Sequence, residues 1–239
     1  MDTLPIQIKK QVEDFTRRLR DVYKDALVSI ILYGSAASGE FAGRHSNINI
    51  AIVLTSTALD ILSKAYTTVH ASGFKDITPV FFTEEFMCTS ADVFPIEFLD
   101  MKENYVILYG KDVLGNLAVD PRNLRFQCEQ ELKAKLVTMK KLYMLTKSAS
   151  SLKQLLFKSL SSSLHILRNI IRLKGKTPPY RKEDILKELQ GEFTIDPSVF
   201  SEAMAAKSSN RRLSPKEIDA LFIRFVRELE KVAAIIDRL

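Results

Sequence analysis

The first hundred residues alternate between helical and strand-like patterns of apolar side chains. Between residues 5 and 26, apolar positions recur every three or four residues from Ile8 onward, which predicts an amphipathic helix. The largely apolar run Leu27–Tyr33 then predicts a buried strand, and the alternation of isoleucines along Ile48–Leu54 predicts a second one. We therefore expect a mixed sheet with flanking helices in this half of the chain.

Capping and turn signals place the other elements of the first half. Thr57 to Asp60 matches a helix-start pattern, and the helix that it predicts runs to about Ala71. Three more strands are expected at Thr78–Phe82, Phe94–Met101 and Tyr105–Tyr109. In the second of these, Glu97 lies between two apolar residues. The sequence thus predicts a sheet of five strands.

From Asp120 onward the pattern is helical throughout. Three long apolar stripes indicate three long helices, which begin after Pro121, near Leu152 and after Pro215. Two shorter helices are expected between the second and the third of these. Asp196 is the predicted capping residue of one shorter helix, and Ser214 is that of the last long helix. The predicted fold class is α+β, with a mixed-sheet domain at 1–115 and an antiparallel helical bundle at 116–239.

Composition narrows the class of protein without naming a function. The 239 residues carry a net charge of +6, which is modest for this length and makes nucleic acid an unlikely partner. The sequence shows no membrane-spanning run and no signal peptide, so we expect a cytoplasmic protein. We attribute a basic cluster around Arg168 and Lys182 to the dipole at a helix C-terminus rather than to a nucleotide or nucleic-acid site.

The stretch from Val28 to Leu54 carries the candidate chemistry. Gly34-Ser35 ends the first strand, and a glycine there lets the backbone turn tightly beside a ligand. The short helix that follows would point its first amides toward a phosphate. Because side chains alternate along a strand, Asn47 and Asn49 are expected side by side on one face.

This arrangement resembles the signature of the nucleotidyltransferase fold shared by polymerase beta and kanamycin nucleotidyltransferase. In that family an Asp-x-Asp pair and a third carboxylate on a neighbouring strand hold catalytic magnesium. The resemblance places Asn47 and Asn49 at the paired positions and Glu97 at the third, with Asp100 as a weaker alternative. It also implies a bacterial protein, with Ser46 at the serine that often precedes the pair. The helical second half resembles the bundle of kanamycin nucleotidyltransferase.

The asparagines indicate a transferase with impaired chemistry, a pseudoenzyme. Mg²⁺ needs anionic oxygen ligands, and asparagine supplies only a neutral carbonyl oxygen. Asn47, Asn49 and Glu97 are therefore weak candidate metal ligands, and we expect no cofactor beyond the Mg²⁺ that a nucleoside triphosphate brings with it. The implied nucleotide-binding residues are Gly34, Ser35, Arg44 and Ser46. The leading hypothesis is a protein that retains nucleotide binding as a sensor or interaction module.

Two other functions fit the same residues. An active Mg²⁺-dependent transferase could move a nucleoside monophosphate to a small molecule or protein, using Glu97 with Asp100 or Glu40 as a reduced metal site. Alternatively, the chain is a structural scaffold that forms a homodimer or binds a protein partner. Whether the chain is an enzyme stays open at this point.

Overall fold

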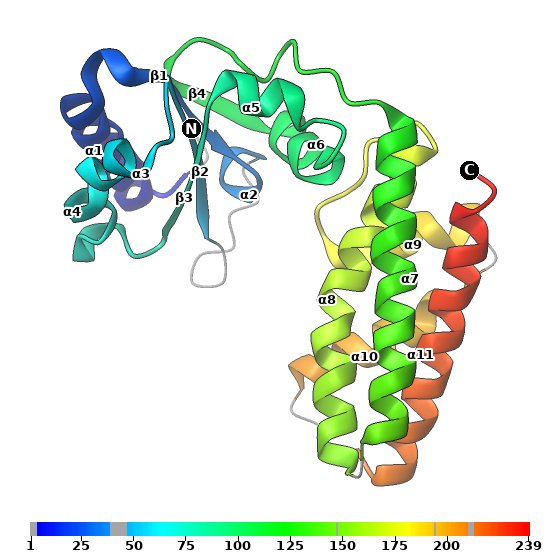
Figure 1. The fold of residues 1–239 in the computed structure, drawn as a ribbon. Coiled ribbons are helices and arrows are strands. Elements are labelled where there is room, and N and C mark those ends of the chain that lie inside the picture. Colours follow the sequence, from blue (N-terminus) through cyan, green and yellow to red (C-terminus); the bar gives the residue numbers. More distant parts are fainter. Residues whose placement is uncertain (1–3, 39–46, 147, 194, 210–212) are drawn as a thin grey trace. The chain divides into compact units, whose positions relative to one another are not determined.

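The fold is taken from a computed structural model of the chain, which describes residues 4–38, 47–146, 148–193, 195–209 and 213–239. The chain divides into two compact units between Asp120 and Pro121. The first unit contains a sheet with helices on both faces, and the second contains only helices (Figure 1). This is the predicted α+β class, with a mixed sheet followed by a helical bundle.

The sheet of the first unit has four strands in the order β3-β2-β1-β4. The strands are β1 (Leu27–Tyr33), β2 (Ile48–Leu54), β3 (Ile77–Phe82) and β4 (Tyr105–Gly110). β1 runs antiparallel to both β2 and β4, whereas β3 runs parallel to β2. The central strands β1 and β2 are buried almost throughout, which is why they read as largely apolar runs in the sequence, interrupted by Ser29 and by Asn49.

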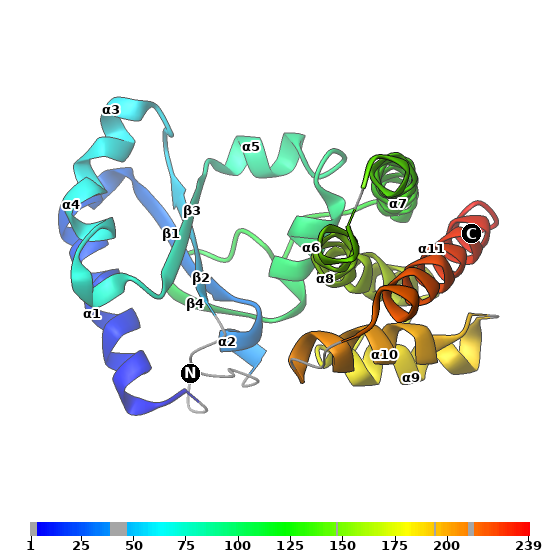
Figure 2. The same cartoon turned by 90° about the horizontal axis from the view of Figure 1, so that it is seen from below.

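The helices of the first unit cover the two faces of this sheet (Figure 2). One face carries α1 (Ile6–Tyr23), η1 (Lys24–Ala26) and the short segments α3 (Leu59–Leu62), η3 (Ser63–Ala65), α4 (Tyr66–Val69) and η4 (Ser72–Phe74). The other carries α5 (Glu84–Thr89) and α6 (Pro95–Glu103). The short α2 (Ser35–Ser38) follows β1 directly.

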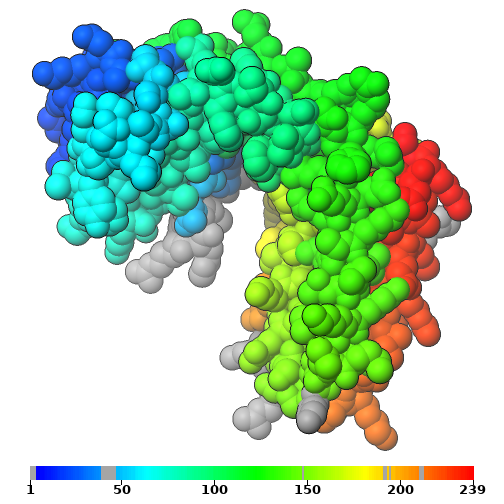
Figure 3. Space-filling view, in the orientation of Figure 1, coloured from blue at the N-terminus to red at the C-terminus, as the bar shows by residue number. Residues whose placement is uncertain are grey.

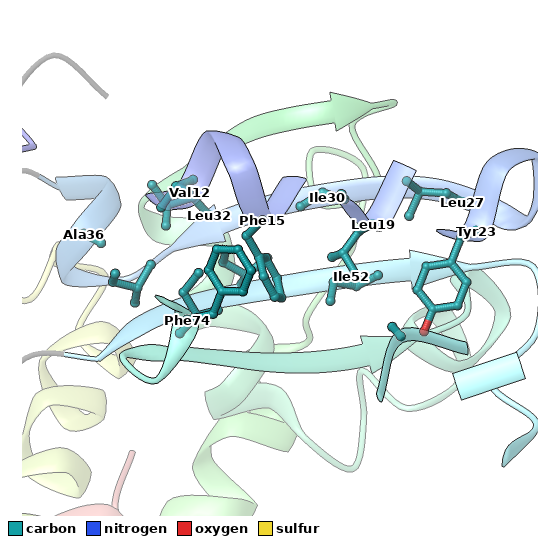
Figure 4. Packing of buried hydrophobic residues seen from close by; sticks show 14 of the residues in the cluster. Val12, Phe15, Leu19, Tyr23, Leu27, Ile30, Leu32, Ala36, Ile52 and Phe74 are labelled. Carbon is teal, nitrogen blue, oxygen red and sulfur yellow. The ribbon is translucent and has the colours of Figure 1, made fainter. Parts of the chain in front are cut away.

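Each face of the sheet has its own apolar core. Phe15 and Leu19 of α1 are fully buried against Ile30 and Ile52, and the ring of Phe15 meets that of Phe74 edge-on at 5.1 Å (Figure 4). On the opposite face, side chains of α5 and α6 pack against alternate residues of the same strands. The alternation therefore divides each strand between two cores, as expected for a sheet covered on both sides.

Two predictions for the first unit are wrong. Phe94–Met101 is not a strand, because Pro95 occupies the first turn of helix α6 and the following residues continue that helix. The predicted helix from Thr57 to Ala71 is three short pieces, and its first residues are not capped by Thr57, since α3 begins after Ala58 with no side-chain cap. The described sheet accordingly has four strands rather than five.

The second unit confirms the predicted helices. It contains α7 (Pro121–Leu145), α8 (Ala149–Leu173), α9 (Lys182–Glu192), α10 (Pro197–Ser208) and α11 (Pro215–Ile236). The three long helices pack on one another and bury the predicted apolar stripes. Asp196 caps α10, and Ser214 forms the predicted capping box with Glu217. α7 is visible as green atoms in Figure 3. Val137 and Met144 on this helix are exposed.

Candidate functional site

The turn after β1 brings Gly34 against Asn49. Gly34 has a φ of 76°, a left-handed conformation that glycine adopts without strain. Its N–H donates to the carbonyl of Asn104 at 3.0 Å, and its own carbonyl accepts from the amides of Ala37 and Ser38. A Cβ atom on Gly34 would lie 3.3 Å from Nδ2 of Asn49. The turn and the second strand therefore meet at this point, as the sequence predicts.

Asn49 belongs to a row of side chains that crosses this end of the sheet. Its register partner on β1 is Tyr33, and its register partner on β3 is Thr78. Tyr33 in turn pairs with Tyr105 on β4. Directly opposed residues project from the same face, with Cβ atoms about 5 Å apart. Thr78, Asn49, Tyr33 and Tyr105 thus form one row, on the face that α6 covers.

One carboxylate that acts on this row comes from α6. The pKa of Tyr33 is raised mainly by burial and further by the negative charge of Asp100. Asp100 is half-buried on α6, next to the apolar side chains that pack under the helix. Of the two acids considered for the third carboxylate position, Asp100 is the one whose charge reaches the row.

Glu97 occupies a different position from the one that the strand prediction implied. It lies in the first turn of α6, and its side chain is exposed. The residue that pairs with Asn49 on the neighbouring strand is Thr78, which is also exposed. The position beside Asn49 that a third carboxylate would occupy is therefore held by a neutral hydroxyl.

Asn47 and Asn49 have different surroundings. Asn47 precedes β2 and is exposed, and Ile48 after it points into the core under α1. Asn47 lines a hollow of about 990 Å³ together with Arg18 and Lys75, which Asn49 does not line. Asn49 lies within β2 and has register partners on β1 and β3, whereas Asn47 precedes the strand.

The residues at the row do not fit a magnesium ion. Asn49 and Thr78 offer neutral oxygens, and Mg²⁺ depends on carboxylates or phosphates for most of its binding energy. Within the described ranges, no three residues among His, Cys, Asp and Glu are grouped so that they could hold a metal ion. Arg44, Ser46 and Glu40, expected near this site, lie outside the described residues.

The basic cluster of the second unit is built into the structure. Arg168 is buried, its Nε donates to the carbonyl of Pro179 at 3.1 Å, and its guanidinium lies 4.3 Å from the ring centre of Tyr180. Lys176 forms an ion pair with Glu188. These contacts fix the loop after α8 against α8, through Arg168, and against α9, through Glu188. No helix in the described part of the chain is both long and apolar enough to cross a membrane.

The order of these elements is that of a nucleotidyltransferase fold: a strand, a glycine turn, a short helix, and a second strand beside the turn. A solved structure with the same architecture is the spectinomycin adenyltransferase AAD(9) from Enterococcus faecialis, described with ATP and spectinomycin. The two chains align with a TM-score of 0.56 and 13% identity over 93% of this chain and 99% of that one. No family model and no curated protein matches the sequence. The similarity confirms the predicted nucleotidyltransferase-like fold.

Sequence reasoning missed Thr78 and Tyr33. No local signal identified them, because Thr78 comes beside Asn49 only through the parallel register of β2 and β3. The assignment of Glu97 depended on a strand that is a helix. Without that strand, β3 is the neighbour of β2, and it carries no acid between Ile77 and Phe82.

Proposed function

We propose that this chain is a nucleotidyltransferase-fold protein that does not transfer nucleotides and instead binds a nucleotide without needing a divalent metal. The observation that carries this proposal is the neutral row beside the glycine turn. Where the fold's catalytic carboxylates would gather, the side chains are Asn49, Thr78 and Tyr33. The AAD(9) structure, described with ATP, makes a nucleotide the first ligand to test.

Electrostatic repulsion between carboxylates and phosphate explains why a site without acids does not need a metal to bind a nucleotide. In the absence of a metal, a carboxylate about 4 Å from a phosphate repels it by roughly 4 kcal/mol per unit charge near a protein surface. A site with paired aspartates therefore needs Mg²⁺ before a triphosphate can bind. A site with Asn49 and Thr78 has no such repulsion to offset, so phosphate binding there does not require a cation.

The same residues supply hydrogen bonds that suit phosphate oxygens. The amide of Asn49 and the hydroxyls of Thr78 and Ser35 are neutral donors. Gly34 keeps the backbone close to them, because it has no Cβ atom to separate the turn from Asn49. Ser35, the first residue of α2, belongs to this proposed site, and Arg44 and Ser46 are further proposed contributors.

Isothermal titration calorimetry with ATP, GTP, CTP and UTP tests the proposal. We expect at least one of them to bind equally well in EDTA and in Mg²⁺. Asn49→Asp should weaken binding in EDTA by about tenfold or more, and Mg²⁺ should restore part of the loss. Gln7→Glu is the matched control, since it adds the same charge at an exposed position of α1, on the opposite face of the sheet.

Two results would overturn the proposal. The absence of heat with all four nucleotides would exclude nucleotide binding at this site. Transfer of an α-phosphate label to any acceptor, abolished by Glu97→Ala or Asp100→Asn, would establish the active transferase that the sequence left open.

A further inference from the structure

The two edges of the sheet differ in how they are protected. β3 carries Pro79, which has no N–H to offer to another strand. β4 reads Tyr105-Val-Ile-Leu-Tyr-Gly110 and contains neither a charge nor a proline. Its central residue, Ile107, is 38% exposed. Soluble proteins normally guard a sheet edge with charges, prolines or a covering segment, so an unguarded apolar edge indicates a partner.

A groove runs along this edge between β4 and α1. It has a volume of about 360 Å³, and its floor is formed by Val106, Ile107 and Leu108. Thr16 of α1 lines the same groove and is only 8% exposed. Its hydroxyl is the one buried side-chain polar atom of the described residues that has no hydrogen-bond partner. An unsatisfied buried hydroxyl is costly, and a polar group from a bound chain would satisfy it.

We propose that β4 pairs with β4 of a second copy of this chain, antiparallel and across a two-fold axis near Ile107, to give one continuous sheet of eight strands. Pairing of the two β4 strands brings the apolar side chains of one copy against those of the other, with Val106 of one copy opposite Leu108 of the other. Such an isologous contact closes after two copies and leaves no further edge of this kind.

The charges on the wall of the groove favour a second copy. Glu13, Arg17 and Arg20 recur at intervals of four and three residues, so they lie on one face of α1, and all three line the groove. A two-fold axis near Ile107 also passes near Thr16 and Arg17, because these residues share the groove with Ile107. The two copies of α1 then run antiparallel, and Glu13 of each copy faces Arg20 of the other. A partner surface with charges of a single sign would place a like charge opposite either Glu13 or Arg20.

Light scattering coupled to size-exclusion chromatography of the full chain tests this interface. We expect twice the mass of one chain at high concentration, with dissociation on dilution. Ile107→Lys should give the mass of one chain without loss of fold, because the residue is already partly exposed. Val137→Lys is the matched control, since Val137 is an exposed apolar residue on α7 and should leave the dimer intact.

A charge swap tests the antiparallel arrangement itself. Glu13→Arg and Arg20→Glu should each be monomeric alone, because each places like charges opposite one another twice. Mixing the two variants should give a heterodimer, in which both contacts become attractive. A monomer at every concentration, a dimer that survives Ile107→Lys, or a mixture that stays monomeric would overturn the proposal. The nucleotide titrations should be unchanged in Ile107→Lys, so this proposal and the proposed function can fail separately.

Discussion

Asn49 and Thr78 lie directly beside each other on the parallel strands β2 and β3, and neither side chain carries a charge. Next to them, the glycine turn leaves just enough room for the Asn49 amide. The nucleotidyltransferase-like fold is therefore present with uncharged side chains at this pair. Both strands contribute an uncharged side chain to this end of the sheet.

Restoring acids at this pair should create a metal site. We expect Asn49→Asp with Thr78→Glu to raise Mg²⁺ or Mn²⁺ affinity by about tenfold or more, since two carboxylates on adjacent strands can bind one hard cation. Calorimetry of the apo protein with each metal provides the measurement. Asn47→Asp with Asn49→Asp is the comparison, and it should gain less, because Asn47 precedes β2 and is not opposed to a residue of β3. A larger gain for that second pair would show that the row is assigned wrongly.

Gly34→Ala should destabilise the first unit. The φ of 76° costs an L-residue about 1–2 kcal/mol, and the new methyl group would press on Asn49 Nδ2. Urea denaturation monitored by circular dichroism measures the change. Gly175 has a similar φ, and a Cβ atom there would have nothing within 4 Å, so Gly175→Ala should show the backbone cost alone. Gly73 has no left-handed φ and the same open space, so Gly73→Ala should leave the stability nearly unchanged. Equal losses for Gly34→Ala and Gly73→Ala would contradict the conformational argument.

The fold was largely predictable because its signals are local. Buried strands such as β1 show as largely apolar runs, and the helices of the bundle show as apolar stripes with capping residues such as Ser214. The position of Glu97 was not predictable in this way. Alternating apolar residues around it fit a strand, whereas Pro95 begins a helix that buries Ile96, Phe98 and Met101 in the core.

The candidate site was predictable only where neighbours are close in sequence. Gly34 and Asn49 come from two strands that follow one another, and the motif contains both. Thr78 reaches the site through a parallel pairing, whose register no local pattern encodes. Asp100 reaches it through the packing of α6, which depends on the whole tertiary fold.

The two cysteines should differ sharply in reactivity. Burial, with a smaller contribution from the charge of Glu131, raises the pKa of the Cys128 thiol to about 12, so the thiolate that reacts is nearly absent at neutral pH. Cys88 is exposed on α5. We expect iodoacetamide to label one cysteine per native chain, at Cys88, and both after denaturation, as measured by intact mass. Labelling of native Cys128 at the rate of Cys88 would show that α7 opens readily.

Asp112 should make the stability of the first unit depend on pH in acid. Its carboxylate accepts hydrogen bonds from the Tyr105 hydroxyl at 2.8 Å and from the amides of Leu114 and Gly115 at 3.0 and 2.8 Å. Burial opposes ionisation, but these bonds together hold the pKa of Asp112 below its usual range. A lowered folded-state pKa contributes stability that is complete above the unfolded pKa of about 4 and is lost as the pH falls through the folded value.

Asp112→Asn tests this sign, because asparagine still accepts hydrogen bonds through its oxygen but does not titrate. At neutral pH we expect the variant to be less stable by about 1 kcal/mol, and Asp112→Ala by somewhat more, since it loses all three bonds. Thermal unfolding between about pH 6 and pH 2 provides the measurement, and the gap between wild type and Asp112→Asn should narrow below about pH 4. A stability difference between wild type and Asp112→Asn that stays constant or widens in acid would mean that the carboxylate charge does not stabilise this turn.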